Sequence, residues 1–127
     1  MTQQTTIEFD ELPIVLDLPP VKKGADYSFT IEMLDDNDAA KDTTGWTMQV
    51  TGRDAGANGD ELFSLTVGDG ITHTPSQGRF VVKIAKTITA TLPATRIVWD
   101  CAVTDSNGDV SYPFEGTLQI LPSVTRL

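Results

Sequence analysis

Short runs in which apolar and polar residues alternate recur along this chain, and they constrain its fold more than any other feature. Residues 25–34 place an apolar side chain at every second position: Tyr27, Phe29, Ile31 and Met33. A period of two with one apolar face is typical of a half-buried strand in an antiparallel sheet. Further strands are predicted at residues 46–51, 62–67, 71–74, 79–84, 96–104, 110–114 and 116–121.

Turn-forming residues separate these runs. The longest such cluster is residues 52–60, which we expect to form an exposed loop, and Asn107-Gly108 is a strong hairpin signal. One helical turn at most is expected in residues 85–92. About seven or eight short strands without paired helices favour an all-β fold, an antiparallel β-sandwich. The aromatic residues expected in its core are Phe29, Trp46, Phe80 and Trp99.

The first twenty residues differ from the rest of the chain. Pro13, Pro19 and Pro20 interrupt short apolar pieces, so residues 1–20 are predicted to form an extended arm or an edge strand, and residues 21–127 the sandwich domain. The arm is too apolar for a free tail. Its apolar side chains are expected to be buried on the chain's own sheet edge or, by strand addition, on another subunit: Ile7, Phe9, Leu12, Ile14, Val15 and Leu16.

The charge of the chain excludes some partners. Nine Lys and Arg stand against eighteen Asp and Glu, which gives a formal net charge of -9. Such a field disfavours binding to nucleic acid and to acidic lipid surfaces. No apolar run approaches the roughly 18 residues that cross a bilayer, so no membrane association is expected. The single cysteine, Cys101, excludes an internal disulfide and an all-cysteine zinc site.

The residues that could carry chemistry do not form a recognisable catalytic set. His73 and Cys101 could be drawn as a thiol pair, but Cys101 lies on an apolar strand face, where a thiol is usually inert. No Gly-x-Ser-x-Gly motif and no phosphate-binding loop occur. We therefore expect no enzymatic activity and no cofactor.

The acidic loops suggest one metal alternative. Asp54, Asn58 and Asp60 could supply oxygen ligands to calcium, although Leu65 stands where an EF-hand loop requires Glu. Turn formation and solubility explain these acidic residues more simply.

The order of several motifs carries a family resemblance. The chain has Tyr27-Ser28-Phe29-Thr30-Ile31 after Gly24, then Asp42-Thr43-Thr44-Gly45-Trp46, Gly78-Arg79-Phe80-Val81-Val82, Val98-Trp99-Asp100, Glu115-Gly116-Thr117-Leu118 and Val124-Thr125-Arg126. Over roughly residues 20–126 it resembles short virion proteins of tailed bacteriophages and the N-terminal domain of phage baseplate upper proteins.

The resemblance implies an immunoglobulin-like sandwich with a structural role in the virion, assembled in the host cytoplasm. It implies protein–protein contact with tail, baseplate, fibre or capsid subunits, formation of a homo-oligomer within the particle, and no catalytic residues. Two alternatives stay open. One is a capsid decoration or head-fibre protein, and the other is a module that binds calcium or carbohydrate at the host surface.

Overall fold

The computed structural model describes residues 2–8, 14–55 and 59–125, with side chains described from Val15 onward. Within these residues the fold is all-β, as predicted, with ten strands. The elements are β1 (Thr2–Glu8), β2 (Ile14–Val15), β3 (Leu18–Lys22), β4 (Tyr27–Leu34), β5 (Thr47–Asp54), β6 (Glu61–Val67), β7 (Gly70–Thr74), the 3₁₀ turn η1 (Pro75–Gln77), β8 (Arg79–Ile84), α1 (Lys86–Thr89), β9 (Arg96–Thr104) and β10 (Val110–Leu121).

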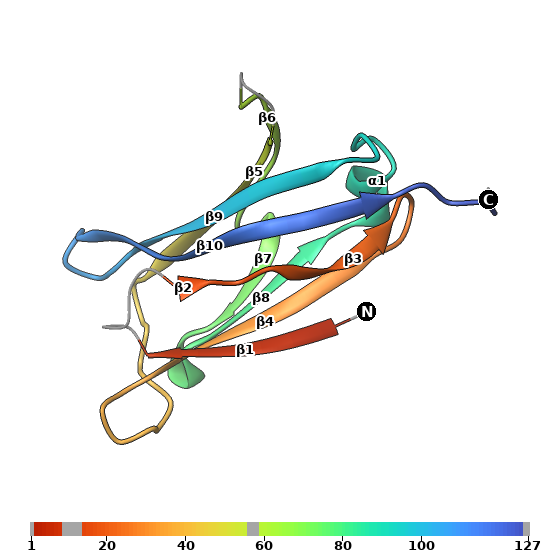
Figure 1. Cartoon of the computed structure of the whole chain (residues 1–127). Helices are drawn as coiled ribbons and strands as arrows, with labels where there is room; N and C mark the ends of the chain where they lie inside the picture. The colour runs from red at the N-terminus through yellow and green to blue at the C-terminus, as the bar shows by residue number, and fades with distance from the viewer. Residues whose placement is uncertain (1, 9–13, 56–58, 126–127) are drawn as a thin grey trace.

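The strands form one continuous hydrogen-bonded sheet that curves until it nearly closes into a barrel (Figure 1). Its order is β1-β4-β8-β7-β6-β5-β9-β10-β2, and β3 also pairs with β10. The join between β6 and β7 is narrow, with two register pairs, Thr66 with Gly70 and Val67 with Ile71. The sheet therefore has two sides, β4-β8-β7 and β6-β5-β9-β10, that face each other across the core.

The sheet is mostly antiparallel, as expected, but its two ends and the short join between β6 and β7 are parallel. β1 pairs with β4 in parallel, and β2 and β3 pair with β10 in parallel. The reason is that the chain crosses between the two sides of the sheet on its way from β3 to β4, so neighbours at the ends are not joined by hairpins. The predicted boundary at residue 20 falls inside β3, where Leu18 and Val21 are both buried.

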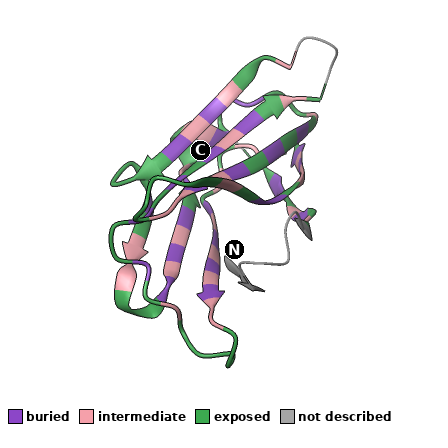
Figure 2. Cartoon of the chain, turned by 90° about the vertical axis from the view of Figure 1, so that its left-hand side faces the viewer, coloured by how far each residue is buried: buried purple, intermediate pink, exposed green. Residues whose placement is uncertain are grey.

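Alternation places one face of each long strand from β4 onward in the core (Figure 2). The four aromatic residues expected inside, Phe29, Trp46, Phe80 and Trp99, are all buried. Trp99 on β9 ties the two sides together, because its ring centroid lies 5.5 Å from that of Phe29 on β4 and 5.1 Å from that of Phe114 on β10. Edge-to-face and tilted contacts of this kind are the favoured geometries of aromatic pairs.

Two glycines lie in register with Trp99, one on each neighbouring strand. These are Gly52 on β5 and Gly116 on β10. A Cβ on Gly52 would overlap the ring of Phe63, and one on Gly116 would overlap the backbone carbonyl of Leu16. Glycine at these positions lets the Phe63 ring and the Leu16 backbone lie directly against the strands that flank Trp99.

Helix and turn predictions were largely correct. The single helical turn is α1, and its buried Thr89 explains the threonine-rich segment: its Oγ1 accepts from the Gly24 N–H at 3.1 Å and donates to the Ala25 carbonyl at 2.8 Å. The predicted loop at 52–60 was placed too early, since β5 continues through Asp54 by pairing with β9. The two strands predicted between 110 and 121 are one strand whose register shifts between Ser111 and Phe114.

Candidate functional site

Most of the exposed large apolar side chains are distributed along the strands of the β9-β10 side of the sheet. Among the described residues, seven large hydrophobic side chains are exposed, and five of them lie on β2, β9 and β10: Val15, Val98, Val110, Tyr112 and Leu121. Within that set none lies on β4, β7 or β8. We call the outer face of β9 and β10, with β2 at its edge, the β9-β10 face.

Val110 and Tyr112 form the most exposed apolar pair on β10, at 59% and 56% exposure. The register of β10 with β9 shifts between Ser111 and Phe114; Val110 lies just before this shift and Tyr112 lies within it. An irregularity of this kind re-aims side chains, and here the two that are left outside are apolar. Tyrosine, which combines an apolar ring with a polar hydroxyl group, is enriched in protein interfaces.

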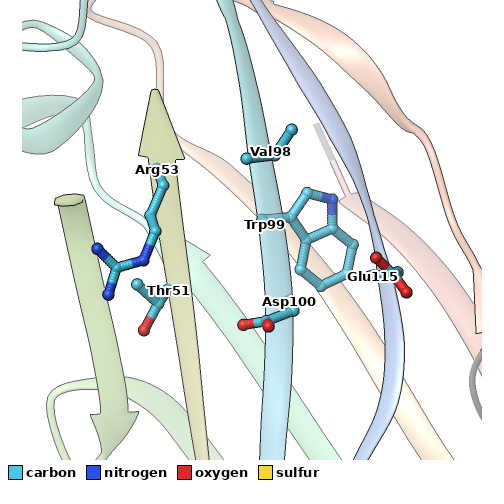
Figure 3. Close-up of a pocket in the computed structure, with 6 residues that line it drawn as sticks. All are labelled: Thr51, Arg53, Val98, Trp99, Asp100 and Glu115. Carbon is cyan, nitrogen blue, oxygen red and sulfur yellow. The ribbon is translucent and has the colours of Figure 1, made fainter. Parts of the chain in front are cut away.

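A shallow hollow of about 140 Å³ lies on the same face (Figure 3). Figure 3 shows that its lining comes from three strands, with Thr51 and Arg53 on β5, Val98, Trp99 and Asp100 on β9, and Glu115 on β10. The hollow is too small and open to enclose a drug-sized ligand, which needs a cavity of several hundred Å³.

The electrostatics of this hollow are unbalanced. Asp100 and Glu115 are directly opposite each other in the register of β9 and β10, and two like charges in that position repel. Arg53 is the nearby cation, but it donates to the Gly59 carbonyl at 3.1 Å and lies 3.9 Å from the Glu61 carboxylate. A lysine or arginine from a partner would relieve the repulsion between the two carboxylates.

His73 has a structural partner in the fold. Its Nε2 lies 2.8 Å from the Oγ1 of the buried Thr43, and its ring stacks on Phe80 with the centroids 4.2 Å apart. Burial lowers the pKa of the imidazole from its ordinary value. These contacts connect the turn at Thr43 to the end of β7. They use one face of the imidazole ring and one of its two nitrogens.

Cys101, which sequence reasoning could draw as a partner of His73, is fully buried on β9. Desolvation, with a smaller contribution from the neighbouring Asp100, raises the pKa of its thiol far above the ordinary range. A thiol in this state is a small hydrophobic side chain and not a nucleophile.

The acidic turns use their carboxylates to hold the backbone. Asp35 Oδ1 accepts from the N–H groups of Asn37 and Ala39, and Asp105 Oδ1 accepts in the same way from Asn107 and Asp109. This bonding is what favours Asp at the start of turns.

For the calcium alternative, the Asp54 N–H donates to the Asp60 carbonyl at 2.9 Å, and Asn58 lies outside the described residues. Searching the described residues finds no group of three His, Cys, Asp or Glu placed to hold a metal ion.

The structure also places the arm residues expected to make assembly contacts. Ile7 is in β1 and Ile14 in β2, where their backbones pair with Met33 and Phe114 of the same chain. Val15 is 71% exposed, whereas Leu16 packs against the core. Phe9 and Leu12 lie outside the described residues.

Sequence reasoning did not single out Val98, Val110 and Tyr112. The available signal was that Val98 shares the polar face of its strand with Asp100, where an aliphatic side chain is unexpected.

Comparison with known proteins gives a fold likeness. No family model and no curated protein matches the sequence. Among solved structures, the chain is similar to the N-terminal domain of phage TP901-1 ORF48, with a TM-score of 0.51 and 13% sequence identity. The match covers 97% of this chain and 99% of that one. At this identity the likeness shows a shared fold. Across the described ranges, no helix is long and apolar enough to pass through a bilayer.

Proposed function

We propose that this protein is a structural component of a tailed-bacteriophage virion that acts by contact with other virion proteins in the tail, baseplate or fibre-attachment apparatus. The observation that carries the proposal is the fold likeness to a domain of phage TP901-1 ORF48, which extends over nearly the whole of both chains. The likeness therefore concerns the fold as a whole and not a single hairpin of it.

The β9-β10 face supports a role by contact. Its apolar side chains are exposed, and its hollow has a surplus of negative charge from Asp100 and Glu115. Exposed apolar groups with polar residues around them are typical of surfaces that are covered in an assembly. The proposed role includes no catalytic step, and the buried state of Cys101 and the ring contacts of His73 are consistent with that.

We also propose that the fold is an immunoglobulin-like sandwich. The supporting feature is the strand order, with β4-β8-β7 on one side and β6-β5-β9-β10-β3 on the other. This is the order of the B-E-D strands and of the C′-C-F-G strands in a variable-type immunoglobulin domain, with β3 beside the last strand.

The test of the virion role is to find the protein in particles. Virions of the phage or prophage that encodes the chain should be purified through high-salt washes and analysed by quantitative mass spectrometry and electron microscopy. We expect a few copies per particle, with density on the tail. A copy number close to that of the major capsid protein would assign the chain to the head instead. Absence from washed particles would contradict a virion role.

A second experiment tests the β9-β10 face. The variant V110S/Y112S removes the two exposed apolar groups of β10, and V67S is the matched control because Val67 is an exposed aliphatic residue on β6. We expect V110S/Y112S to be lost from particles while its circular dichroism and melting temperature stay close to those of V67S. Normal incorporation of V110S/Y112S would show that this face is not the contact.

A further inference from the structure

β1 determines whether β4 is an interior strand or an edge strand. All seven residues of β1 have register partners in β4, from Thr2 with Ser28 to Glu8 with Leu34. The other edge of β4 is paired with β8. β4 also carries four fully buried core side chains: Tyr27, Phe29, Ile31 and Met33. Without β1, the strand at the centre of the core would present an open edge, which is a template for another strand.

β1 is a strand of mostly polar composition. The sequence of β1 is Thr-Gln-Gln-Thr-Thr-Ile-Glu, with a single apolar residue, Ile7. In strand addition the main-chain hydrogen bonds supply affinity, and side chains supply specificity. The main-chain hydrogen bonds of such a strand can therefore form with the β4 edge of its own chain or of another copy, as long as the register is the same.

The part of the chain that follows β1 is anchored on β10 by contacts in which β1 takes no part. There the Leu16 N–H donates to the Glu115 carbonyl at 2.7 Å, and Asp17 Oδ1 accepts from the N–H and Oγ1 of Thr117 at 3.1 and 2.9 Å. Farther along, Leu18 and Val21 of β3 are buried in the core. The anchored part of the chain therefore begins after β1, and residues 9–13 connect the two parts.

We propose that β1 is an exchangeable strand through which two copies of this chain associate: β1 of one copy pairs in parallel with β4 of the second, and reciprocally. The second copy is the occupant because it carries the same acceptor edge with the same seven register positions. Exchange of an identical element between protomers is a low-cost route to a dimer, since every contact of the monomer is regained. This inference does not depend on the proposed virion role.

Concentration and salt set the balance between the two pairings. Within one chain, the covalent link keeps β1 near β4 at an effective concentration on the order of millimolar. Exchange is therefore favoured where copies are crowded. Each copy carries a formal charge of -9, so added salt, which screens repulsion between copies, increases the exchanged fraction.

Disulfide trapping distinguishes the two pairings. Gln4 and Thr30 are register partners, and neighbouring strands are about 4.8 Å apart, within the range that a disulfide spans. The single variants Q4C and T30C, carrying different tags, are co-expressed and oxidised at increasing protein concentration. The double variant Q4C/T30C is oxidised alone. Co-expressed Q4C and T47C are the control, because Thr47 is exposed on β5 and has no partner in β1. Cys101 is buried and stays reduced in the folded chains.

We expect Q4C and T30C to form a mixed disulfide dimer well above the Q4C/T47C control, rising with concentration and salt. We also expect Q4C/T30C to give both internally linked monomer and linked dimer. Internally linked monomer alone, with no mixed dimer at any concentration, would overturn the exchange. So would the absence of both products, since β1 would then not pair with β4 at all.

Discussion

The contact between Gly116 and Leu16 gives the sharpest test of the fold, because a single methyl group should break it. In G116A, the new Cβ overlaps the backbone carbonyl oxygen of Leu16. A backbone atom cannot rotate away as a side chain can, so the Leu16–Asp17 segment must move off β10. The substitution therefore asks whether the N-terminal part of this chain packs on its own sheet as the structure shows.

The expected loss is set by the hydrogen bonds that such a movement breaks. They are the bond from the Leu16 N–H to Glu115 and the two bonds from Thr117 to the Asp17 carboxylate. Each contributes about 0.5–1.5 kcal/mol to the net stability, so the total is about 2–4 kcal/mol. For a chain of this length that loss corresponds to a fall in melting temperature of roughly 10 °C.

Urea unfolding followed by the fluorescence of the two buried tryptophans, Trp46 and Trp99, measures this loss directly. G116A should shift the midpoint to lower urea with an unchanged slope, because the surface exposed on unfolding stays the same. The control is G108A, where a Cβ meets nothing within 4 Å but the backbone has a φ of +85°. That variant should lose only about 1 kcal/mol, the cost of a left-handed conformation. If G116A is no less stable than G108A, the Leu16–Asp17 segment does not lie against Gly116 and the reasoning is refuted.

A double variant, G116A/D17A, should lose less stability than the sum of the losses of the two single variants, because both substitutions remove the same contact.

Three further predictions concern Thr89, His73 and Cys101. T89V should lose about 2 kcal/mol in urea unfolding, because it leaves the Gly24 N–H and the Ala25 carbonyl without their partner, whereas the exposed T91V should lose much less. His73 should titrate below 6.5 in its NMR spectrum. Since the unfolded chain then binds the proton more tightly, stability should be full above about pH 7 and fall as the pH drops through the two pKa values, and H73Q should flatten this fall. Cys101 should react with a thiol reagent only at the rate at which the protein opens, and a fast reaction in native buffer would contradict its burial.

The parts of the fold that could be predicted from sequence are those set by local pattern. The alternation around Phe29 and Trp99 fixes both the strand and the face that is buried, because side chains in a strand point to opposite sides in turn. The helical turn could be anticipated from the threonine-rich segment before Pro93, but the role of Thr89 in holding the β3–β4 turn could not. That contact joins residues 64 positions apart in sequence.

The parallel pairing at the ends of the sheet could not be predicted from local sequence pattern, for a related reason. Nothing in the composition of β1 distinguishes pairing with β4 from pairing with another edge, because its side chains are almost all polar. The partner of such a strand is decided by which edge the rest of the fold leaves open.

The same limit explains why the candidate contact face was missed. Whether Val110 and Tyr112 point outward depends on the register shift between Ser111 and Phe114, and register is a property of two strands together. With regular pairing from Phe114 back along β10, Tyr112 would share the inward face of Phe114. The irregularity leaves Ser111 opposite the buried Val103 and Tyr112 in solvent. One extra residue in a strand thus turns a side chain that regular pairing would bury into a surface group, and it does so on the face that carries the opposed carboxylates of Asp100 and Glu115. The exposed apolar groups and the unbalanced charge are both produced by the pairing of β9 with β10, so that pairing is the feature on which a contact role for this face depends.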